Sequence, residues 1–328
     1  MPDIIRWGIL STGRIAGVFA SDLNIVEGVE LAAVGSRNLE LAKAFSEQYS
    51  ISKYYGSYEE LVSDKKIDVI YVATPHMFHK DNSILCLKNG KAVLCEKAFT
   101  INAQEAKQVI DAAKNSRLFL MEGMWTRFLP VIQKCRQFIN DGIIGEVQTI
   151  TGDFGFKANY DPEHRLFNPE LGGGALLDIG VYLVSFVSWI LGKPSSIDSM
   201  ATMGETGVDE HECILLNFPD GKMAKLFATL RSNTPIEILI LGDKGRIRVH
   251  SPFFKSSAIT LSVIGEKDQI IEMPFTGNGF VHEINEVTKN IREGKLESDI
   301  MPLNESLSIM ETMDQLRKKW GVLYPSEK

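Results

Sequence analysis

Short apolar segments alternate with amphipathic ones over the first third of the chain. The apolar segments, which are rich in strand-forming residues, are 4–10, 29–35, 68–73, 91–95 and 118–121. Such segments are typical of parallel strands buried on both faces. The segments between them have helical patterns, one capped by Asn38 and another opened by a capping box of Asn102 and Glu105. Strands that alternate with helices predict an α/β domain with a doubly wound parallel sheet.

The pattern changes after Trp125. One helical stretch at residues 130–141 is followed by segments with a two-residue period, at 146–156, 210–218, 222–230, 237–241, 245–249, 258–263 and 269–273. Consecutive strands joined by tight turns predict an open, mainly antiparallel sheet in an α+β domain. We therefore expect a Rossmann dinucleotide-binding domain at residues 1–121 and a substrate-binding and dimerisation domain at residues 122–328. The C-terminal helix is free to pack back on the first domain.

Composition narrows the class of protein. The 328 residues are 44% hydrophobic and 23% charged, which suits two domains with full cores, and the formal net charge is −7. Because no block of lysine and arginine stands out, we do not expect a nucleic-acid partner. The most apolar run, 175–191, contains Asp178 and Tyr182, so we expect a buried helix and no membrane span. Four scattered cysteines and a start without signal-peptide features predict a cytoplasmic protein.

The turn after the first predicted strand has the pattern of a dinucleotide site. In Ser11-x-Gly13-x-x-Ala16, the glycine lets backbone amides approach a pyrophosphate, and Ala16 allows close packing of helix on strand. Ser11 replaces the first glycine of the usual fingerprint, so an ordinary strand-turn-helix is the alternative. The helix start would hold phosphates with its amides and its dipole. We expect the cofactor to contact Ser11, Thr12, Gly13, Arg14 and Ile15.

The end of the second predicted strand indicates which cofactor is preferred. An NAD site usually has an acidic residue there, which accepts hydrogen bonds from the ribose hydroxyls. This chain has Ser36 and Arg37 instead. A guanidinium can stack on adenine and bind a 2′-phosphate with two hydrogen bonds, so we expect NADP(H) to be preferred over NAD(H). The alternative is a solvated arginine that precedes a helix.

Two further loops follow predicted parallel strands and should share the same sheet edge. The first contains Thr74, Pro75, His76 and His79, and the second contains Glu96 and Lys97. We expect these residues to line the cofactor. The two histidines resemble a metal pair, but no set of further ligands accompanies them, so no metal is expected.

A glycine-rich turn opens the most apolar helix of the second domain. Three glycines at 172–174 would let the backbone come close to a ligand, and Asp178 and Tyr182 stand four residues apart on one helix face. A buried carboxylate needs a partner, because leaving it unpaired is costly. That partner is either a group at the active site or, as the alternative, a residue of the same domain.

These motifs together resemble those of the Gfo/Idh/MocA oxidoreductases, in order and in spacing over nearly the whole chain. The resemblance rests on the glycine turn, the Thr74 to His79 loop, Glu96-Lys97, and Gly174-x-Leu176-x-Asp178-x-Gly180-x-Tyr182. The segments at 93–97 and 118–128 are most similar to the branch of the family with the dimeric dihydrodiol dehydrogenases and NADP-dependent xylose dehydrogenases. Ala98 is a departure, since the family usually has proline after the lysine.

The resemblance implies roles for particular residues. Lys97 and Tyr182 would act at the reacting alcohol, with Asp178 orienting them. The substrate pocket would be lined by Trp125, Phe154 and Phe280. Arg127, in the segment at 118–128 that carries the resemblance, is expected to help bind the cofactor. Many sugar dehydrogenases of the family have histidine where this chain has Tyr182.

We therefore expect an NADP(H)-dependent enzyme that interconverts a secondary alcohol or lactol with a carbonyl or lactone, on a sugar or a cyclic trans-diol. One alternative is a glycosidase that retains its nicotinamide cofactor, and another is a regulator that binds NADP without turnover. A homodimer is also expected. The second domain has too few helices to cover both faces of its sheet, so one apolar face should find a partner.

The proton on the reacting oxygen needs a donor within hydrogen-bond reach. Free tyrosine has a pKa of about 10, and a neighbouring ammonium group would lower it. We expect Lys97 to lower the pKa of Tyr182 in this way, with Asp178 anchoring the lysine, once the two domains bring these residues to the nicotinamide. The competing assignment makes Lys97 the proton donor, and His164 is a third candidate.

Overall fold

The computed structural model describes residues 4–327, and the chain divides into two compact units. The first unit comprises Met1–Trp125 and Thr276–Leu307, and the second comprises Thr126–Phe275 and Ser308–Lys328. The N-terminal part of the first unit therefore ends at Trp125, close to the predicted boundary at residue 121. A second part, Thr276–Leu307, comes from the segment that was predicted to belong to the second domain. That late segment contains α8 (Val281–Arg292) and the predicted substrate residue Phe280.

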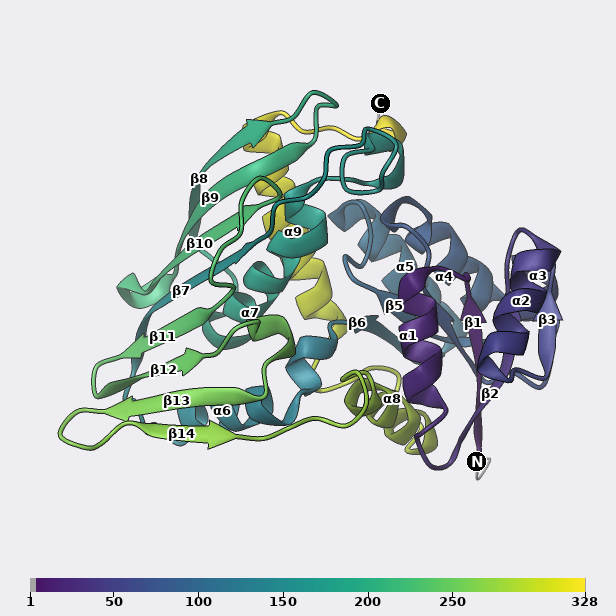
Figure 1. The fold of residues 1–328 in the computed structure, drawn as a ribbon, viewed down its shortest axis with the longest axis horizontal. Coiled ribbons are helices and arrows are strands. Elements are labelled where there is room, and N and C mark those ends of the chain that lie inside the picture. Colours follow the sequence, from purple (N-terminus) through teal and green to yellow (C-terminus); the bar gives the residue numbers. More distant parts are fainter. Residues whose placement is uncertain (1–3, 328) are drawn as a thin grey trace. The chain divides into compact units, whose positions relative to one another are not determined.

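The first unit is built on a six-stranded parallel sheet, which confirms the predicted doubly wound domain. Its strands follow the order β3 (Lys53–Tyr55), β2 (Val29–Gly35), β1 (Ile5–Leu10), β4 (Val69–Val72), β5 (Ala92–Glu96) and β6 (Leu120–Gly123). Figure 1 labels all of them except β4. Strand β3 was not predicted, because it has only three residues and none of them is buried. The central strands β1, β4 and β5 are almost wholly buried, as their apolar composition predicts.

Two helices of the first unit begin at the caps that the sequence predicts. The helices of this unit are α1 (Arg14–Leu23), α2 (Leu39–Tyr49), α3 (Tyr58–Ser63), α4 (His79–Lys88), α5 (Ala103–Ser116) and α8. The Asn38 side chain accepts a hydrogen bond from Leu41 N at 3.1 Å, and that of Asn102 accepts one from Glu105 N at 2.8 Å. Both predicted N-caps are thereby confirmed.

The second unit is built on an eight-stranded sheet. Its strands follow the order β14 (Gln269–Glu272), β13 (Ala258–Val263), β12 (Gly245–Val249), β11 (Ile238–Gly242), β7 (Val147–Gly155), β10 (Met223–Thr229), β9 (Asp209–Asn217) and β8 (Ser196–Met203). Every neighbouring pair is antiparallel except β7 with β10. The mainly antiparallel sheet is confirmed. Strand β8 was not predicted, because its serine, aspartate and threonine residues resemble a loop.

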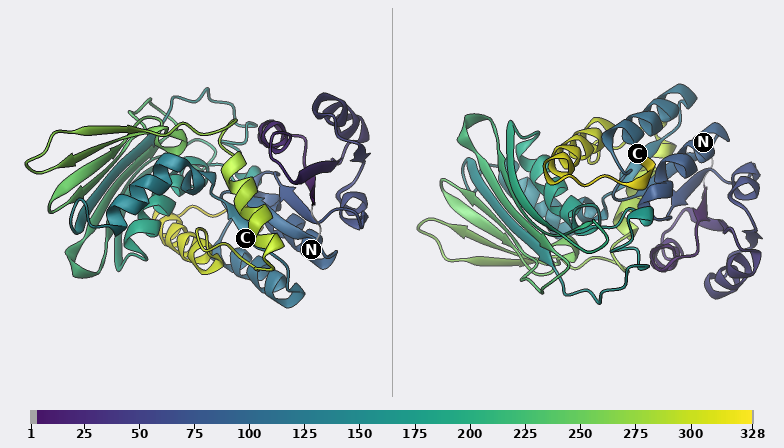
Figure 2. Two further views of the ribbon diagram at one scale, coloured as in Figure 1. Left: turned by 90° about the horizontal axis from the view of Figure 1, so that it is seen from below. Right: turned by 90° about the horizontal axis from the view of Figure 1, so that it is seen from above.

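Three helices lie on one face of this sheet. They are α6 (Pro130–Asn140), α7 (Val181–Leu191) and the part of α9 (Leu303–Trp320) that belongs to this unit (Figure 2). Helix α7 packs on β7 and β10, and Trp320 Nε1 of α9 donates a 3.0 Å hydrogen bond to Ser199 Oγ of β8. A π-helical turn, η4 (Leu176–Gly180), precedes α7, where the sequence predicts one regular helix.

The opposite face of the eight-stranded sheet has no helix on it among the described elements of this unit (Figure 2). Met200 is 79% exposed there, and Leu215 is 38% exposed. Leu239 lies on the same face, opposite Thr151 on one side and Arg248 on the other. Apolar side chains are thus interleaved with polar ones over several strands.

The segment Pro169–Leu191 is long and apolar enough to cross a membrane by length and composition. Its most apolar window has a mean hydropathy of 1.8, and 78% of that window is buried inside the structure. A helix buried to this degree has the environment of a core helix, because other parts of the protein already cover most of its apolar side chains.

Candidate active site

The glycine turn follows β1 at the carboxyl edge of the parallel sheet. Gly13 is the N-cap residue of α1, and no side chain caps that helix end through it. A Cβ added at Gly13 would meet only Ser11 Oγ, at an ordinary 3.6 Å. The protein's own packing therefore does not require glycine here. Open space before a helix N-terminus fits the phosphates of a dinucleotide, whose close approach to the backbone would explain the glycine.

Ser11 has a backbone conformation that usually requires glycine. Its φ is +119°, in the region that L-residues rarely adopt. The Ser11 hydroxyl accepts a hydrogen bond from Gly13 N at 3.3 Å, which offsets part of the strain. Ser11 thus has the backbone conformation of the glycine that it replaces in the fingerprint. Thr12 and Ile15 are half-buried beside this turn, and Arg14 is exposed.

Arg37 is held at the carboxyl end of β2, where the sequence places cofactor selection. Its guanidinium carbon lies 5.6 Å from the centre of the Phe78 ring. Burial raises the pKa of Tyr58, and the charge of Arg37 and a hydrogen bond with it oppose that rise. Ser36 is buried, and its hydroxyl accepts a hydrogen bond from Asn38 N at 3.3 Å. An exposed arginine oriented by two aromatic residues fits the binding of a phosphate.

The loops after β4 and β5 are joined by His79. This side chain is fully buried, with Nε2 2.7 Å from the Thr74 carbonyl oxygen and Nδ1 2.8 Å from that of Ala98. Burial lowers the pKa of His79, and the two carbonyl oxygens oppose that effect. The buried ring therefore connects the backbones of the two loops. Pro75 is half-buried, and His76 is 8% exposed.

Glu96 and Lys97 lie where β5 ends. The hydroxyl of Tyr71 donates a hydrogen bond to Glu96 Oε1, and Lys97 N donates to Glu96 Oε2 at 3.1 Å. Lys97 is half-buried, and the peptide bond between Lys97 and Ala98 is cis. The glutamate thus fixes the backbone from which the lysine side chain projects.

A row of aromatic rings crosses the first unit. The ring of Phe280 stacks on that of Trp125, with centroids 4.9 Å apart and planes 17° apart. Phe19 lies edge-on to Phe280 at 5.8 Å and stacks on Tyr71 at 3.7 Å. Two of the three predicted substrate residues, Trp125 and Phe280, are therefore in contact although 155 positions separate them in the chain.

Asp22 holds the late segment in place. It lies in α1, is 1% exposed, and accepts hydrogen bonds from Asn278 N, Asn278 Nδ2 and Phe280 N at 2.8 to 2.9 Å. This carboxylate was not predicted as part of the site. The signal in the sequence is an aspartate on the apolar face of α1, where a charged residue needs several donors.

In the second unit, Asp178 lies within the π-helical turn and is 6% exposed. Arg165 Nη1 donates to Asp178 Oδ1 at 2.6 Å, and Arg165 Nη2 lies 3.4 Å from Oδ2. The alternative in which Asp178 pairs within its own domain is thus observed, with a partner that the sequence did not indicate. The Arg165 side chain is 46% exposed, so water weakens the attraction between the two charges.

Tyr182 lies in an aromatic cluster one turn beyond Asp178. Phe154 of β7 is tilted against Tyr182 at 5.8 Å and stacks on Phe254 at 4.6 Å. Phe254 lies 5.6 Å from Tyr182 and was not predicted. The tyrosine is 8% exposed, so most of its ring is packed.

Arg127 and His164 occupy different environments in the second unit. Arg127 is buried, and its Nη2 donates to the Ser185 carbonyl oxygen of α7 at 2.7 Å, with its guanidinium 5.5 Å from the Trp189 ring. It therefore fixes the helix that carries Tyr182. His164 is exposed, and its Nδ1 accepts a hydrogen bond from Leu166 N at 3.3 Å.

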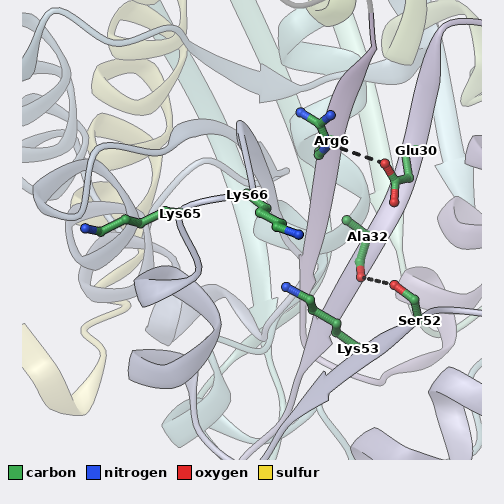
Figure 3. Close-up of a pocket in the computed structure, with 7 residues that line it drawn as sticks. All are labelled: Arg6, Glu30, Ala32, Ser52, Lys53, Lys65 and Lys66. Carbon is green, nitrogen blue, oxygen red and sulfur yellow. Dashed lines mark hydrogen bonds and ion pairs between the residues drawn. The ribbon is translucent and has the colours of Figure 1, made fainter.

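Two pockets lie in the first unit, one at the glycine turn and one at the amino ends of the strands. Residues around the glycine turn, including Gly13, Tyr49 and Asn278, line a pocket of about 410 Å³. Another, of about 460 Å³, lies at the amino ends of the strands, where Arg6 pairs with Glu30 at 3.4 Å (Figure 3) and Lys53 with Asp64 at 2.5 Å. Because its charged side chains partly neutralise one another, we assign this pocket no ligand.

Within residues 4–327 no three His, Cys, Asp or Glu side chains form a metal-binding group, and the rings of His76 and His79 are 5.7 Å apart.

Comparison with known proteins identifies the class and the family. Residues 5–124 match an oxidoreductase family with an NAD-binding Rossmann fold, and residues 132–248 match the GFO/IDH/MocA C-terminal domain. The chain is thus an NAD(P)-dependent oxidoreductase. It belongs to the Gfo/Idh/MocA family, which confirms the resemblance seen in the sequence.

Individual relatives cover the whole chain. A trans-1,2-dihydrobenzene-1,2-diol dehydrogenase of Xenopus laevis is 38% identical over 98% of this chain and 99% of its own. A D-xylose 1-dehydrogenase (NADP(+)) of Hypocrea jecorina is 34% identical over 99% of this chain and 94% of its own. The solved structure of an aldose-aldose oxidoreductase from Caulobacter crescentus has the same fold, with a TM-score of 0.89 and 24% identity over 97% of each chain.

The contacts of Asp22 lead to a stability prediction. Replacing Asp22 with alanine removes a charged acceptor from three donors of the 278–280 segment, so the first unit should lose about 3 kcal/mol. Chemical denaturation followed by tryptophan fluorescence measures this loss. Asp22→Asn retains one acceptor oxygen and should lose less. A loss below about 1 kcal/mol in Asp22→Ala would show that the aromatic stack alone holds the segment.

Proposed function

We propose that this protein is an NADP(H)-dependent dehydrogenase that oxidises a secondary alcohol or lactol of a cyclic trans-diol or a sugar. The observation that carries the cofactor choice is Arg37, held over Phe78 at the β2 end where an NAD site would have an acidic residue. The names of the full-length relatives support the substrate class, since one acts on a trans-dihydrodiol and another on D-xylose.

The first unit would hold the cofactor. The pyrophosphate would lie over the amides of Gly13 and Arg14 at the start of α1, and the 2′-phosphate would lie against Arg37 and Ser36. Thr74, Pro75, His76 and the backbone of Glu96 would line the nicotinamide side, with His79 acting through the two loops that it joins. When bound, NADP⁺ accepts a hydride from the substrate carbon.

Aromatic side chains would determine which substrates fit. Trp125 and Phe280 present stacked faces in the first unit, and Phe154 lies beside Tyr182 in the second. Flat apolar walls suit the ring of a cyclic diol or of a pyranose, whose faces are apolar and whose edges are polar.

The proton would be handled by Tyr182 and Lys97. Oxidation of an alcohol releases its hydroxyl proton, and Tyr182 would accept it while the ammonium group of Lys97 stabilises the phenolate and the substrate oxygen. Asp178 would anchor the lysine by exchanging its exposed partner Arg165 for the ammonium group. Arg127, which the sequence analysis expects at the cofactor, would act here as a positioning residue, because it fixes α7 at Ser185.

The direct test of the proposed function is a screen of reduced-cofactor formation at 340 nm. NADP⁺ or NAD⁺ would be combined with trans-dihydrodiols, pentoses and hexoses. We expect turnover with NADP⁺ on at least one member of these classes. Binding of NADP⁺ without turnover on any of them would favour a regulatory role.

Cofactor selection by Arg37 is the second prediction. Arg37→Ala should weaken NADP(H) binding by about 1.5 to 3 kcal/mol, the range for a hydrogen bond to a charged group, and leave NAD(H) binding nearly unchanged. Arg37→Lys should give an intermediate loss for NADP(H), because it keeps the charge and loses the planar fork. Fluorescence titration with both cofactors measures these changes. An equal loss for NADP(H) and NAD(H) would make Arg37 a structural residue.

The third prediction concerns Tyr182. Tyr182→Phe keeps the packing against Phe154 and should lower kcat by roughly 10²–10⁴, the usual size of general acid–base catalysis, without changing NADPH affinity. Steady-state kinetics with a separate fluorescence measurement of NADPH binding tests this. A nearly normal kcat in Tyr182→Phe, together with an inactive Lys97→Met, would assign the proton transfer to the lysine.

The fourth prediction is a homodimer formed through the uncovered face of the eight-stranded sheet. Its interleaved apolar side chains, such as Leu239 and Leu215, would be buried by a second copy. Light scattering at micromolar concentration should give twice the single-chain mass of 36.6 kDa. Leu239→Arg should shift the mass towards the monomer, whereas Ile264→Arg, at an exposed hairpin tip, should not. A single-chain mass for the wild type would contradict the dimer.

A cytoplasmic location fits the cysteines. Cys86, Cys95, Cys135 and Cys213 are all free thiols, and three of them are buried. A reducing compartment would keep them in this state.

A further inference from the structure

Two carboxyl groups are buried directly beneath the turn that carries Asp178. Asp209 and Glu212, both in β9, are fully inaccessible to solvent. Asp209 Oδ2 accepts a 2.6 Å hydrogen bond from Leu176 N, the first amide of the π-helical turn. One carboxylate thus receives the amide at the start of the turn, a position where negative charge is favoured by the helix dipole.

The glycines at either side of the turn make room for these acids. A Cβ on Gly174, whose φ is +116°, would come within 2.4 Å of Asp209 Oδ1. A Cβ on Gly180 would come within 2.4 Å of Glu212 Oε1. Gly174, one of three glycines that the sequence suggests would let the backbone approach a ligand, and Gly180 are therefore both required by side chains of the neighbouring sheet.

As two carboxylates, this pair would lack donors. Asp209 Oδ1 and both oxygens of Glu212 have no hydrogen-bond partner among residues 4–327. A single proton on Glu212 reduces the deficit, because the protonated carboxyl can donate to Asp209. Burial, and then the charge of Asp209 and a hydrogen bond with it, raise the pKa of Glu212 well above its usual range. Burial also raises the pKa of Asp209, and the amide of Leu176 opposes this.

Other charged and titratable groups face the pair from the C-terminal part of the chain. Arg317 of α9 lowers the pKa of Asp209 by its charge, but it is itself paired with Asp314 at 2.8 Å and Glu327 at 2.7 Å. Tyr324 is buried and donates a 2.6 Å hydrogen bond to the Gly173 carbonyl oxygen. Its phenol stays neutral, because burial and the negative charge of Asp209 raise its pKa. A site with one compensated cation favours one shared negative charge over two.

We propose that Asp209 and Glu212 share one proton and act as positioning residues, which hold the π-helical turn so that Asp178 and Tyr182 are presented for the reaction. This inference rests on the proposed function for the roles of Asp178 and Tyr182. The shared proton itself does not depend on it. The pair works through the backbone: Asp209 holds Leu176 N, and Glu212 fills the space beside Gly180 while donating to Asp209.

The experiment compares Glu212→Gln with Glu212→Leu. Glutamine keeps a donor for Asp209 and cannot ionise, so we expect a kcat within about threefold of wild type. Leucine has similar size but no donor, so a buried carboxylate is left short of a partner, and kcat should fall by roughly tenfold or more. The Kd for NADPH, measured by fluorescence, should stay unchanged in both variants.

The second readout is the pH dependence of unfolding, which requires no turnover. A carboxyl group with a raised pKa in the folded state is ionised first in the unfolded chain. Its contribution to stability is therefore fully present below about pH 4.3 and is lost as pH rises towards the folded pKa, by up to about tenfold in the folding constant per pH unit. Glu212→Gln removes this loss. The difference in melting temperature between Glu212→Gln and wild type should therefore grow from pH 5 to pH 8.

A matched control lies in the same strand. Glu210 pairs with the half-exposed Arg231 at 2.8 Å, so the difference between Glu210→Gln and wild type should stay constant from pH 5 to pH 8. A constant difference for Glu212→Gln as well, or a Glu212→Gln protein that fails to fold, would overturn the shared proton. Equal kcat in the glutamine and leucine variants would overturn the positioning role. A protein without activity on any tested substrate would contradict the proposed function. The pH dependence of unfolding would still show whether Asp209 and Glu212 share a proton.

Discussion

The cost of taking a carboxyl group out of water shapes both units of this protein. A buried carboxylate needs hydrogen-bond donors or a proton, and several of the donors used here come from segments that are distant in the chain. Asp22 ties α1 to the segment with Phe280, and Glu96 fixes the backbone of Lys97. Asp209 receives the first amide of the turn that contains Asp178. The predicted site residues are positioned by these acids as much as by apolar packing.

The second constraint is the direction of the parallel strands. All strands of the first sheet run the same way, so the loops after β1, β2, β4 and β5 meet at one edge. Gly13, Arg37, Thr74 and Lys97 follow those four strands in that order. A dinucleotide is long enough to contact all four loops. The residues in the later loops therefore strengthen the prediction of a dinucleotide site, which the incomplete glycine fingerprint alone supports only weakly.

Much of the fold could be predicted because the signals were local. Asn38 and Asn102 cap helices with their own side chains, so the sequence shows where those helices begin. The short apolar runs between turn residues are typical of buried strands. The rest depends on contacts over long distances in sequence. Asp22 meets Asn278, and Asp178 meets Arg165, without any motif that relates the partners. The π-helical turn contacts Asp209 and Glu212 of β9, and Leu176 N and Asp209 are 33 positions apart in the chain. Strand β8 was missed because its polar residues lie on an edge strand.

An NAD(P)-dependent dehydrogenase transfers hydrogen directly between a carbon atom of its substrate and the nicotinamide. The most direct measurement uses a trans-diol or sugar deuterated at the reacting carbon, with mass spectrometry of the reduced cofactor. We predict one deuterium in NADPH formed from the labelled substrate and none in NADPH formed from the unlabelled substrate. Reduced cofactor without deuterium, or a cleaved or altered substrate without any net reduction of NADP⁺, would contradict it.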